Sequence, residues 1–217
     1  MKHIAVISGG MDSVTMLYDI KGLFPLDIIE VISFDYGQRH KKELLAAKAT
    51  CEKLGLKYDI IDITSLTSFI SNSALTGDKP VPHGHYADEN MKKTVVPNRN
   101  MIMLSIAVGI AVNREAVDVW TGVHAGDHAI YPDCRPEFIE KMNTVTLISN
   151  FQPVEIKAPY LMIDKGDIAK IGRELGVDYS LTWTCYEGQE NPCGKCGACV
   201  ERAEAFAKAG MIDPLIK

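Results

Sequence analysis

The sequence predicts an α/β protein: a doubly wound parallel sheet with a small four-cysteine appendage near its C-terminal end. Three observations support this prediction. Strand-like and helix-like segments alternate along the chain, a glycine-containing turn follows the first strand directly, and four cysteines crowd into residues 185–199. Alternation favours a parallel sheet, because successive parallel strands need a crossover connection, which is usually a helix.

Five apolar segments rich in β-branched residues are expected to be strands: residues 2–7, 27–34, 58–63, 117–121 and 153–158. Six segments are expected to be helices: residues 13–21, 40–54, 99–112, 135–148, 165–175 and 199–209. Cys51 lies on the apolar face of the second helix and is expected to be a core residue. Residues 64–98 show no sustained period, which is typical of a lid or binding loop.

Composition limits the possible functions. With 217 residues the chain can bury a substantial core, and we expect one compact unit of a domain at 1–184 and an appendage at 185–217. The net charge of −5 argues against a nucleic-acid partner, because binding a phosphate backbone needs a basic surface. No apolar run is long enough for a membrane helix and no signal-peptide pattern is present, so a cytoplasmic protein is expected.

The turn after the first strand, at residues 8–13, reads Ser-Gly-Gly-Met-Asp-Ser. Gly9 and Gly10 lack a Cβ, so they can adopt positive φ and bring backbone N–H groups close to an anion. Asp12 or Ser13 is expected to start the following helix, whose N-terminus favours negative charge. The turn is neither a GxxxxGK[ST] loop nor GxGxxG. The alternative is an ordinary strand–helix turn with a good N-cap.

Polar groups also follow the second strand, where the chain reads Phe-Asp-Tyr-Gly-Gln-Arg-His. Ligands of open α/β sheets bind outside the carboxyl ends of the strands, so Tyr36, Gln38, Arg39 and His40 should face the same crevice as the glycine turn. Arg99 opens an apolar helix, and its guanidinium could hold phosphate in a bidentate way. The alternatives are a helix-capping turn and a solvated arginine.

The loop after the fourth strand carries His124, Asp127 and His128. These residues could form a metal triad, or they could hydrogen-bond a polar heterocycle, since a carboxylate accepts well from an N–H/NH₂ edge. A polar surface loop is the alternative. Lys165 lies at a predicted helix start, where a cation is unfavourable, which suggests that it reaches phosphates instead. A solvated surface lysine is the alternative there.

The cysteines near the C-terminal end have the spacing C-x7-C-x2-C-x2-C, formed by Cys185, Cys193, Cys196 and Cys199. Four thiolates can complete a tetrahedral shell with no open position, which favours a structural zinc over a catalytic one. An iron–sulfur cluster uses the same ligands and is the alternative. Disulfides are disfavoured by the intracellular character of the chain.

In this order, these segments resemble the 7-cyano-7-deazaguanine synthase family of the PP-loop ATP pyrophosphatases. The resemblance is carried by SGGMDS (8–13), FDYGQRH (34–40), VPNRN (96–100), TGV (121–123), YPDCR (131–135), IDK (163–165), TCYEG (184–188) and CGKCGAC (193–199). The chain departs from the family at Met11, where Gln is frequent, and at Asn98, where Gly is frequent. Residues 124–130 read HAGDHAI and keep only Asp127 in register.

The resemblance implies a fold of the adenine nucleotide alpha-hydrolase-like type and a C–N ligase activity. The implied reaction converts 7-carboxy-7-deazaguanine and ammonia, with ATP, to 7-cyano-7-deazaguanine through an adenylated carboxylate and an amide, in queuosine and 7-deazaguanine biosynthesis. The implied cofactors are ATP, Mg²⁺ and a structural Zn²⁺. The implied partners are small-molecule substrates and a second copy of the chain, with no nucleic acid and no membrane.

The resemblance also implies roles for particular residues. The implied catalytic residues are Asp12, Ser13, Arg99 and Lys165. The implied nucleotide-binding residues are Ile7, Ser8, Gly9, Gly10, Met11, Asp12, Ser13, Val14, Thr15, Met16, Leu17 and Arg39. The implied contacts of the deazaguanine are Tyr36, Asp127, Asp133 and Arg135, and the implied metal ligands are Cys185, Cys193, Cys196 and Cys199.

Three other functions fit parts of this pattern. A tRNA-modifying thiolase would need a reactive cysteine and usually a basic RNA-binding domain. An NAD or GMP synthetase would share the glycine turn but would lack the cysteine cluster. A non-catalytic nucleotide sensor or zinc-ribbon interaction module would bind ATP without forming AMP.

Overall fold

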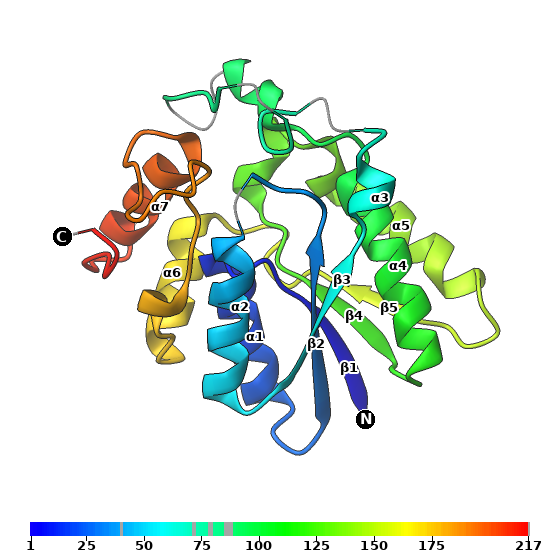
Figure 1. Ribbon diagram of the computed structural model, residues 1–217. Helices are drawn as coiled ribbons and strands as arrows, with labels where there is room; N and C mark the ends of the chain where they lie inside the picture. The colour runs from blue at the N-terminus through cyan, green and yellow to red at the C-terminus, as the bar shows by residue number, and fades with distance from the viewer. Residues whose placement is uncertain (40, 71–72, 78–79, 85–88, 217) are drawn as a thin grey trace.

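The computed structural model describes residues 1–39, 41–70, 73–77, 80–84 and 89–216, with backbone only at 89–90 and 127–128 (Figure 1). His40 of the loop after the second strand lies outside these residues. Five parallel strands form the central sheet in the order β3-β2-β1-β4-β5. The strands are β1 (Lys2–Val6), β2 (Ile28–Asp35), β3 (Lys57–Asp62), β4 (Asp118–Thr121) and β5 (Glu155–Lys157).

Helices cover both faces of the sheet (Figure 1). On one face lie α4 (Arg99–Asn113) and α5 (Pro136–Ile148), and on the other lie α1 (Met11–Leu23), α2 (Lys42–Leu54) and α6 (Lys165–Glu174). Successive strand residues point to opposite faces, so Ile4 of β1 packs with the first group and Ala5 with the second. The predicted doubly wound sheet is confirmed.

The remaining elements are short or lie near the C-terminal end. Helix α7 (Gly197–Lys208) packs on α6, and Phe206 shares a buried cluster with Met11 of α1 and Ala169 of α6. The short helix α3 (Thr64–Thr67) follows β3. Short 3-10 helices occupy Glu89–Thr94, Ala125–Ala129, Pro132–Cys134 and Tyr179–Leu181.

Three expectations need correction. Helix α1 begins at Met11, and its N-cap is Gly10 rather than Asp12 or Ser13, because the Ser13 hydroxyl is used inside the turn, where it donates to the Gly10 carbonyl oxygen. Helix α7 begins two residues earlier than residue 199. The interval 64–98 contains α3 and a 3-10 helix, both too short to produce a period in the sequence.

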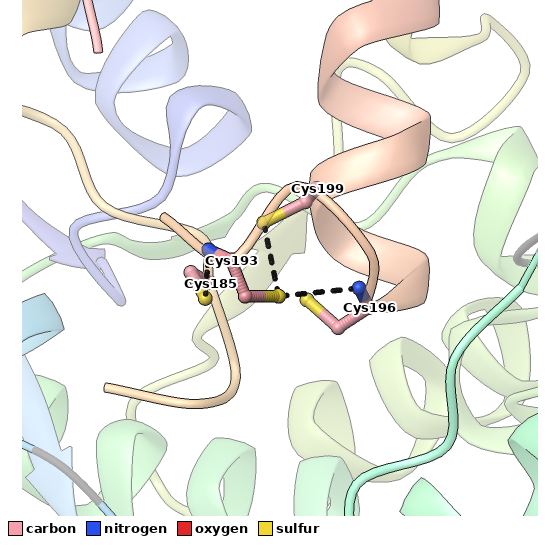
Figure 2. A group of neighbouring side chains, drawn as sticks. All are labelled: Cys185, Cys193, Cys196 and Cys199. Carbon is pink, nitrogen blue, oxygen red and sulfur yellow. Dashed lines mark hydrogen bonds between the residues drawn. The ribbon is translucent and has the colours of Figure 1, made fainter. Parts of the chain in front are cut away.

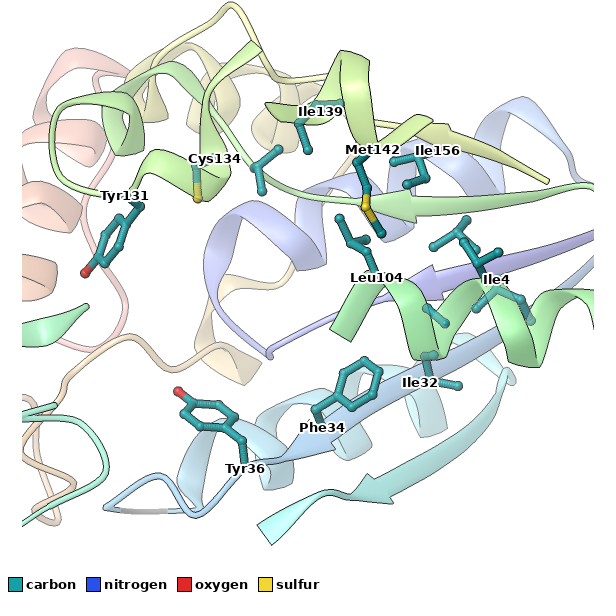
Figure 3. Packing of buried hydrophobic residues seen from close by; sticks show 14 of the residues in the cluster. Ile4, Ile32, Phe34, Tyr36, Leu104, Tyr131, Cys134, Ile139, Met142 and Ile156 are labelled. Atoms are coloured by element: carbon teal, nitrogen blue, oxygen red, sulfur yellow. The ribbon is translucent and has the colours of Figure 1, made fainter. Parts of the chain in front are cut away.

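Helix α4 belongs to the largest apolar stretch of the chain. A 23-residue helical stretch, Met91–Asn113, is long and apolar enough to cross a membrane by length and composition alone. Leu104 of α4, however, packs with Ile4 and Ile32 of the sheet (Figure 3). One face of this helix, formed by Leu104, Ala107, Val108 and Ala111, therefore packs in the core against the sheet.

The strand order fixes where a ligand can bind. The strand that follows β1 in the chain, β2, lies on one side of it, and β4 lies on the other side. In open parallel sheets such a reversal opens a crevice at the carboxyl ends of the strands. The turn at residues 8–13 and the loops after β2 and β4 all lie at this edge.

The turn at residues 8–13 is packed directly against α2. Gly9 has φ +89°, and a Cβ at this position would lie 2.0 Å from the carbonyl oxygen of Glu43 and 2.9 Å from the amide nitrogen of Ala47. Gly10, with φ −74°, does not need positive φ. Position 9 therefore requires glycine for two reasons, its backbone conformation and its packing against α2. Positive φ was expected for both glycines and is found only at Gly9.

We predict that Gly9→Ala lowers the free energy of unfolding by about 2 kcal/mol or more, because left-handed backbone strain adds to overlap with rigid backbone atoms. The matched control is Gly22→Ala in α1, where an added Cβ meets nothing within 4 Å. The control should be stabilised by about 0.5 kcal/mol, since alanine restricts the unfolded chain. Urea unfolding of both variants measures the difference, and equal stabilities would contradict the assignment.

Candidate active site and metal centre

A cavity of about 230 Å³ opens at the carboxyl edge of the sheet. It is lined by the ends of β1, β2 and β4, the first turns of α1, α2, α4 and α6, and residues at the start of and within the cysteine segment. Its polar lining consists of Ser8, Asp12, Ser13, Tyr36, Gln38, Arg39, Glu43, Arg99, Asn100, Thr121, His124, Tyr131, Cys134, Lys165, Trp183, Thr184 and Tyr186. Segments far apart in the sequence thus meet around one space.

The turn at residues 8–13 is closed by its own hydroxyl groups. The amide of Ser8 donates to Ser13 Oγ at 3.2 Å, and the amide of Gly10 donates to Ser8 Oγ at 3.2 Å. The amide of Trp183 donates to the Gly9 carbonyl oxygen at 2.9 Å, which ties the turn to the segment before the cysteines. The turn leads into α1, so the positive end of the helix dipole lies at the cavity. This arrangement suits an anionic ligand.

Asp12 lies among charged neighbours on the first turn of α1. Its Oδ2 is 3.4 Å from Lys165 Nζ and 3.7 Å from His124 Nε2. Its Oδ1 is buried and has no hydrogen-bond partner among the described residues. A buried carboxylate oxygen without a donor is costly. A hard cation that prefers oxygen ligands would satisfy it, so the residues present fit Mg²⁺.

Arg99 lies between two tyrosine rings at the start of α4. Its guanidinium carbon is 5.7 Å from the ring centre of Tyr36 and 5.8 Å from that of Tyr131. Burial disfavours the charge, but Tyr36, Tyr131, Cys134 and Asp133 outweigh it and hold the pKa of Arg99 well above its ordinary value. Figure 3 shows both tyrosines at one end of the apolar cluster, with their hydroxyl groups beyond it. Arg99 is thus a fixed cation on an aromatic wall.

A second carboxylate on the wall is Glu43, from the first turn of α2. It accepts a hydrogen bond from Gln38 Nε2 at 3.1 Å. Burial raises the pKa of Glu43 to about 7, although Arg99 and the Gln38 hydrogen bond oppose the shift. Sequence reasoning missed Glu43, because a polar residue in the first turn of a helix carries no signal that a cavity lies beside it.

The structure brings together half of the expected nucleotide, catalytic and ring-contact residues around the cavity. Those that line the cavity are Ile7, Ser8, Gly10, Asp12, Ser13, Tyr36, Arg39, Arg99 and Lys165. Those that do not line it are Gly9, Met11, Val14, Thr15, Met16, Leu17, Asp133 and Arg135. Met16 and Leu17 point into the core beneath the sheet, as does Cys51, the predicted core cysteine.

Two residues that were expected to contact the deazaguanine ring do not line the cavity. Asp133 Oδ2 accepts from the amide of Asn100 at 2.9 Å and so caps the start of α4. Arg135 is exposed at the N-cap of α5. Asp127 lies in the 3-10 helix Ala125–Ala129, and its side chain is outside the described part of the structure. The roles of these three residues stay predictions.

The four C-terminal cysteines converge (Figure 2). The sulfur atoms of Cys185, Cys193, Cys196 and Cys199 all lie within 4.8 Å of one another. Amides of Cys193, Lys195 and Cys196 donate to Cys185 Sγ or Cys193 Sγ at 3.3 to 3.4 Å. Hydrogen bonds from Cys196 and Cys199 hold the pKa of the Cys185 thiol well below its usual range. Sulfur atoms gathered in this way and supported by N–H donors form a metal-binding group.

The segment at 80–84 lies against this cysteine group. Val81 is buried with Cys185 and Cys196, and the backbone of His83 pairs with Cys196 in an isolated antiparallel bridge. The amide of Gly84 donates to the Lys195 carbonyl oxygen at 3.1 Å. Part of the long interval after β3 is therefore held by the cysteine segment.

Comparison with known proteins gives a match along almost the whole chain. The family model described as "Queuosine biosynthesis protein QueC" matches residues 2–210. A 7-cyano-7-deazaguanine synthase of Marinomonas sp. (strain MWYL1) is 54% identical over 214 residues, which cover 99% of this chain and 97% of that protein. One of Hahella chejuensis (strain KCTC 2396) is 54% identical over 218 residues, covering 99% and 92%.

Solved structures show the same fold at low identity. A U34-tRNA thiolase NcsA from Methanococcus maripaludis with its [4Fe-4S] cluster has a TM-score of 0.53 and 14% identity, and the match covers 95% of this chain and 63% of that one. A 4-thiouridine synthetase in an RNA complex with bound ATP has a TM-score of 0.53 and 19% identity, covering 96% and 50%.

The structural matches support a PP-loop-type fold, and the sequence matches identify the family. Both the family model and the relatives extend from β1 into the cysteine-bearing helix α7. The chain belongs to the QueC family of queuosine biosynthesis, whose curated relatives are 7-cyano-7-deazaguanine synthases and hence ligases that form C–N bonds.

Proposed function

We propose that this protein converts 7-carboxy-7-deazaguanine and ammonia to 7-cyano-7-deazaguanine, at the expense of two ATP molecules cleaved to AMP and pyrophosphate. The observation that carries the proposal is the cavity itself, in which the turn at residues 8–13 meets Arg99 and Lys165. Family membership supports the same reaction. The acid must be activated first, because a carboxylate repels nucleophiles and oxide is a poor leaving group.

In the first half of the proposed reaction, a carboxylate oxygen attacks the α-phosphorus of ATP. The bond between the α- and β-phosphates breaks, and pyrophosphate leaves with its electron pair. Ammonia then adds to the acyl carbon of the adenylate, AMP leaves, and one proton is released to give the amide. In the second half, the amide oxygen attacks the α-phosphorus of a second ATP, and pyrophosphate leaves with its electron pair. Loss of AMP, with the two N–H protons released, then forms the nitrile.

The chain's own residues would act by positioning and by offsetting charge. Backbone amides of residues 8–13, with the hydroxyls of Ser8 and Ser13, would hold the pyrophosphate. Arg39, Arg99 and Lys165 would offset phosphate charge. Asp12 would hold Mg²⁺ through its unpartnered oxygen, and the ion would supply further charge neutralisation on the phosphates.

Contacts to the deazaguanine ring are proposed on two different grounds. For Tyr36 the support is its position in the cavity wall. For Asp127, Asp133 and Arg135 the support is the family resemblance. Asp133 could act on the cavity through Asn100, which lines it and donates to the Asp133 carboxylate.

We propose a structural Zn²⁺ for the cysteine group. Four sulfur ligands around one zinc at about 2.3 Å lie about 3.8 Å from one another, a separation that falls below the observed upper limit of 4.8 Å. Thiolates around an iron–sulfur cluster stand further apart, because several iron atoms lie between them. With four cysteines the shell is complete, so no position is left for substrate.

The remaining proposals concern organisation. We propose that residues 185–217 act as an appendage packed on residues 1–184 in one compact unit, supported by the cluster that α7 shares with α1 and α6. The family resemblance supports a cytoplasmic homodimer that acts on small molecules, and light scattering would test its mass.

The direct test is incubation of the purified protein with 7-carboxy-7-deazaguanine, ATP, Mg²⁺ and ammonium, followed by mass spectrometry. We expect the nitrile together with two AMP per product, and the amide at early times. ATP that binds without AMP formation would instead favour a nucleotide sensor, and would overturn the proposal.

We predict that Asp12→Asn lowers kcat by roughly 100-fold or more, because the variant loses the charge at the proposed cation site. The melting temperature should stay close to that of the wild type, since the side chain keeps its shape. Glu52→Gln, at an exposed position of α2, is the matched control and should retain full turnover. Near-normal AMP formation by the Asp12 variant would refute its role.

We predict that Cys196→Ser loses the bound metal and lowers the melting temperature, because metal binding contributes directly to folding. Elemental analysis should give one zinc per chain for the wild type and much less for the variant. Cys51→Ala, in the core beneath the sheet, should keep its metal despite a modest loss of stability. A stable, active Cys196 variant without metal would argue against a structural zinc, and iron in the wild type would favour the cluster.

A further inference from the structure

Helix α7 brings a carboxylate to the cavity region. Glu201 Oε2 lies 2.5 Å from Lys165 Nζ, and the same ammonium is 3.4 Å from Asp12 Oδ2. The other oxygen, Glu201 Oε1, lies against the loop after β4, since a Cβ on Gly126 would be 2.7 Å from it. The Lys165 ammonium therefore lies between two carboxylates that come from opposite ends of the chain.

All three charged groups are shielded from water. The exposed fractions of the side chains are 9% for Lys165, 13% for Glu201 and 15% for Asp12. A buried ammonium needs a nearby opposite charge, because desolvation otherwise disfavours its charged form. Glu201 supplies the shorter of the two contacts. Of these two carboxylates, that of Glu201 is thus the nearer to the ammonium.

Helix packing explains why Glu201 can reach this position. Gly166, next to Lys165, is covered by the side chain of Lys208 from α7, which would lie 2.4 Å from an added Cβ. The first turn of α7 carries Cys199 and its N-cap is Cys196, so two of the four cysteines share this helix with Glu201. The position of α7 therefore sets the position of the carboxylate.

We infer that Glu201 is a positioning residue for the ligase reaction: it holds the Lys165 ammonium in the cavity and partly neutralises it until a phosphate ligand arrives. This inference rests on the proposed function, because it takes the cavity to be the active site. It gives α7 a role in the reaction in addition to metal binding. Glu201 does not line the cavity and acts through Lys165.

The test compares Glu201→Gln with Glu204→Gln, an exposed position on the same helix. Glu201→Gln should lower kcat for AMP formation by about ten-fold, since a charged hydrogen bond that orients Lys165 is lost. The KM for ATP should not rise, because removing a negative charge near the phosphates does not weaken their binding. Glu201→Asp should recover part of kcat, and Glu204→Gln should match the wild type.

A double-mutant cycle with Lys165→Met, read by calorimetry of pyrophosphate binding, needs no turnover. Glu201→Gln should tighten pyrophosphate binding roughly three-fold or more when Lys165 is present, because the ammonium loses its competing partner. In the Lys165→Met background the same substitution should change pyrophosphate binding by a different factor, because the two residues interact. Melting temperature and zinc content are measured for every variant.

Several outcomes would overturn the inference. One is a Glu201→Gln protein that behaves like Glu204→Gln in both assays. Another is a change in pyrophosphate binding of equal size with and without Lys165. The third is a loss of zinc and stability that accounts for the lower kcat. If the wild type forms no nitrile, the proposed function fails, while the pyrophosphate cycle still decides whether Glu201 and Lys165 are coupled.

Discussion

The contact between Gly9 and helix α2 is the constraint on which the site depends. Because position 9 has no side chain, the carbonyl oxygen of Glu43 can approach the turn closely, and the amide of Trp183 reaches the Gly9 carbonyl oxygen from the other side. The turn is thus fixed by a helix that follows β2 and by a segment that leads to the cysteines. Its amides are held in place before any ligand binds, which reduces the entropy lost on binding.

Charge is distributed unequally around the cavity. Arg99 is flanked by tyrosine rings and keeps its charge through their oxygens and nearby acidic groups, whereas Lys165 is neutralised by Asp12 and Glu201. The two cations therefore differ in their availability to an anion. In the proposed function, Arg99 would be a permanent cation of the wall, whereas Lys165 would exchange a carboxylate for a phosphate. Local cations of this kind would let a protein of net charge −5 bind a highly charged nucleotide.

Both apolar packing and hydrogen bonds join the cysteine-bearing end of the chain to the rest of the molecule. Phe206 packs with α1 and α6, while the buried guanidinium of Arg202 binds Asp213, Thr182 and the Tyr179 carbonyl oxygen. These contacts hold the segment at 179–182, and the next two residues, Trp183 and Thr184, line the cavity. A metal site here can stabilise the fold and shape the cavity wall at the same time, because both tasks use the same helix.

The sequence by itself determined the layered α/β architecture, the turn at residues 8–13, the core position of Cys51 and the four-cysteine group. Each depends on local periodicity or on residues adjacent in the chain. Tertiary structure alone placed Glu43 and Glu201 beside Arg99 and Lys165, directed Met16 and Leu17 into the core, and gave Asp133 a capping role at α4. These placements depend on how distant helices pack, and a polar residue on a helix carries no local signal of what its neighbours will be.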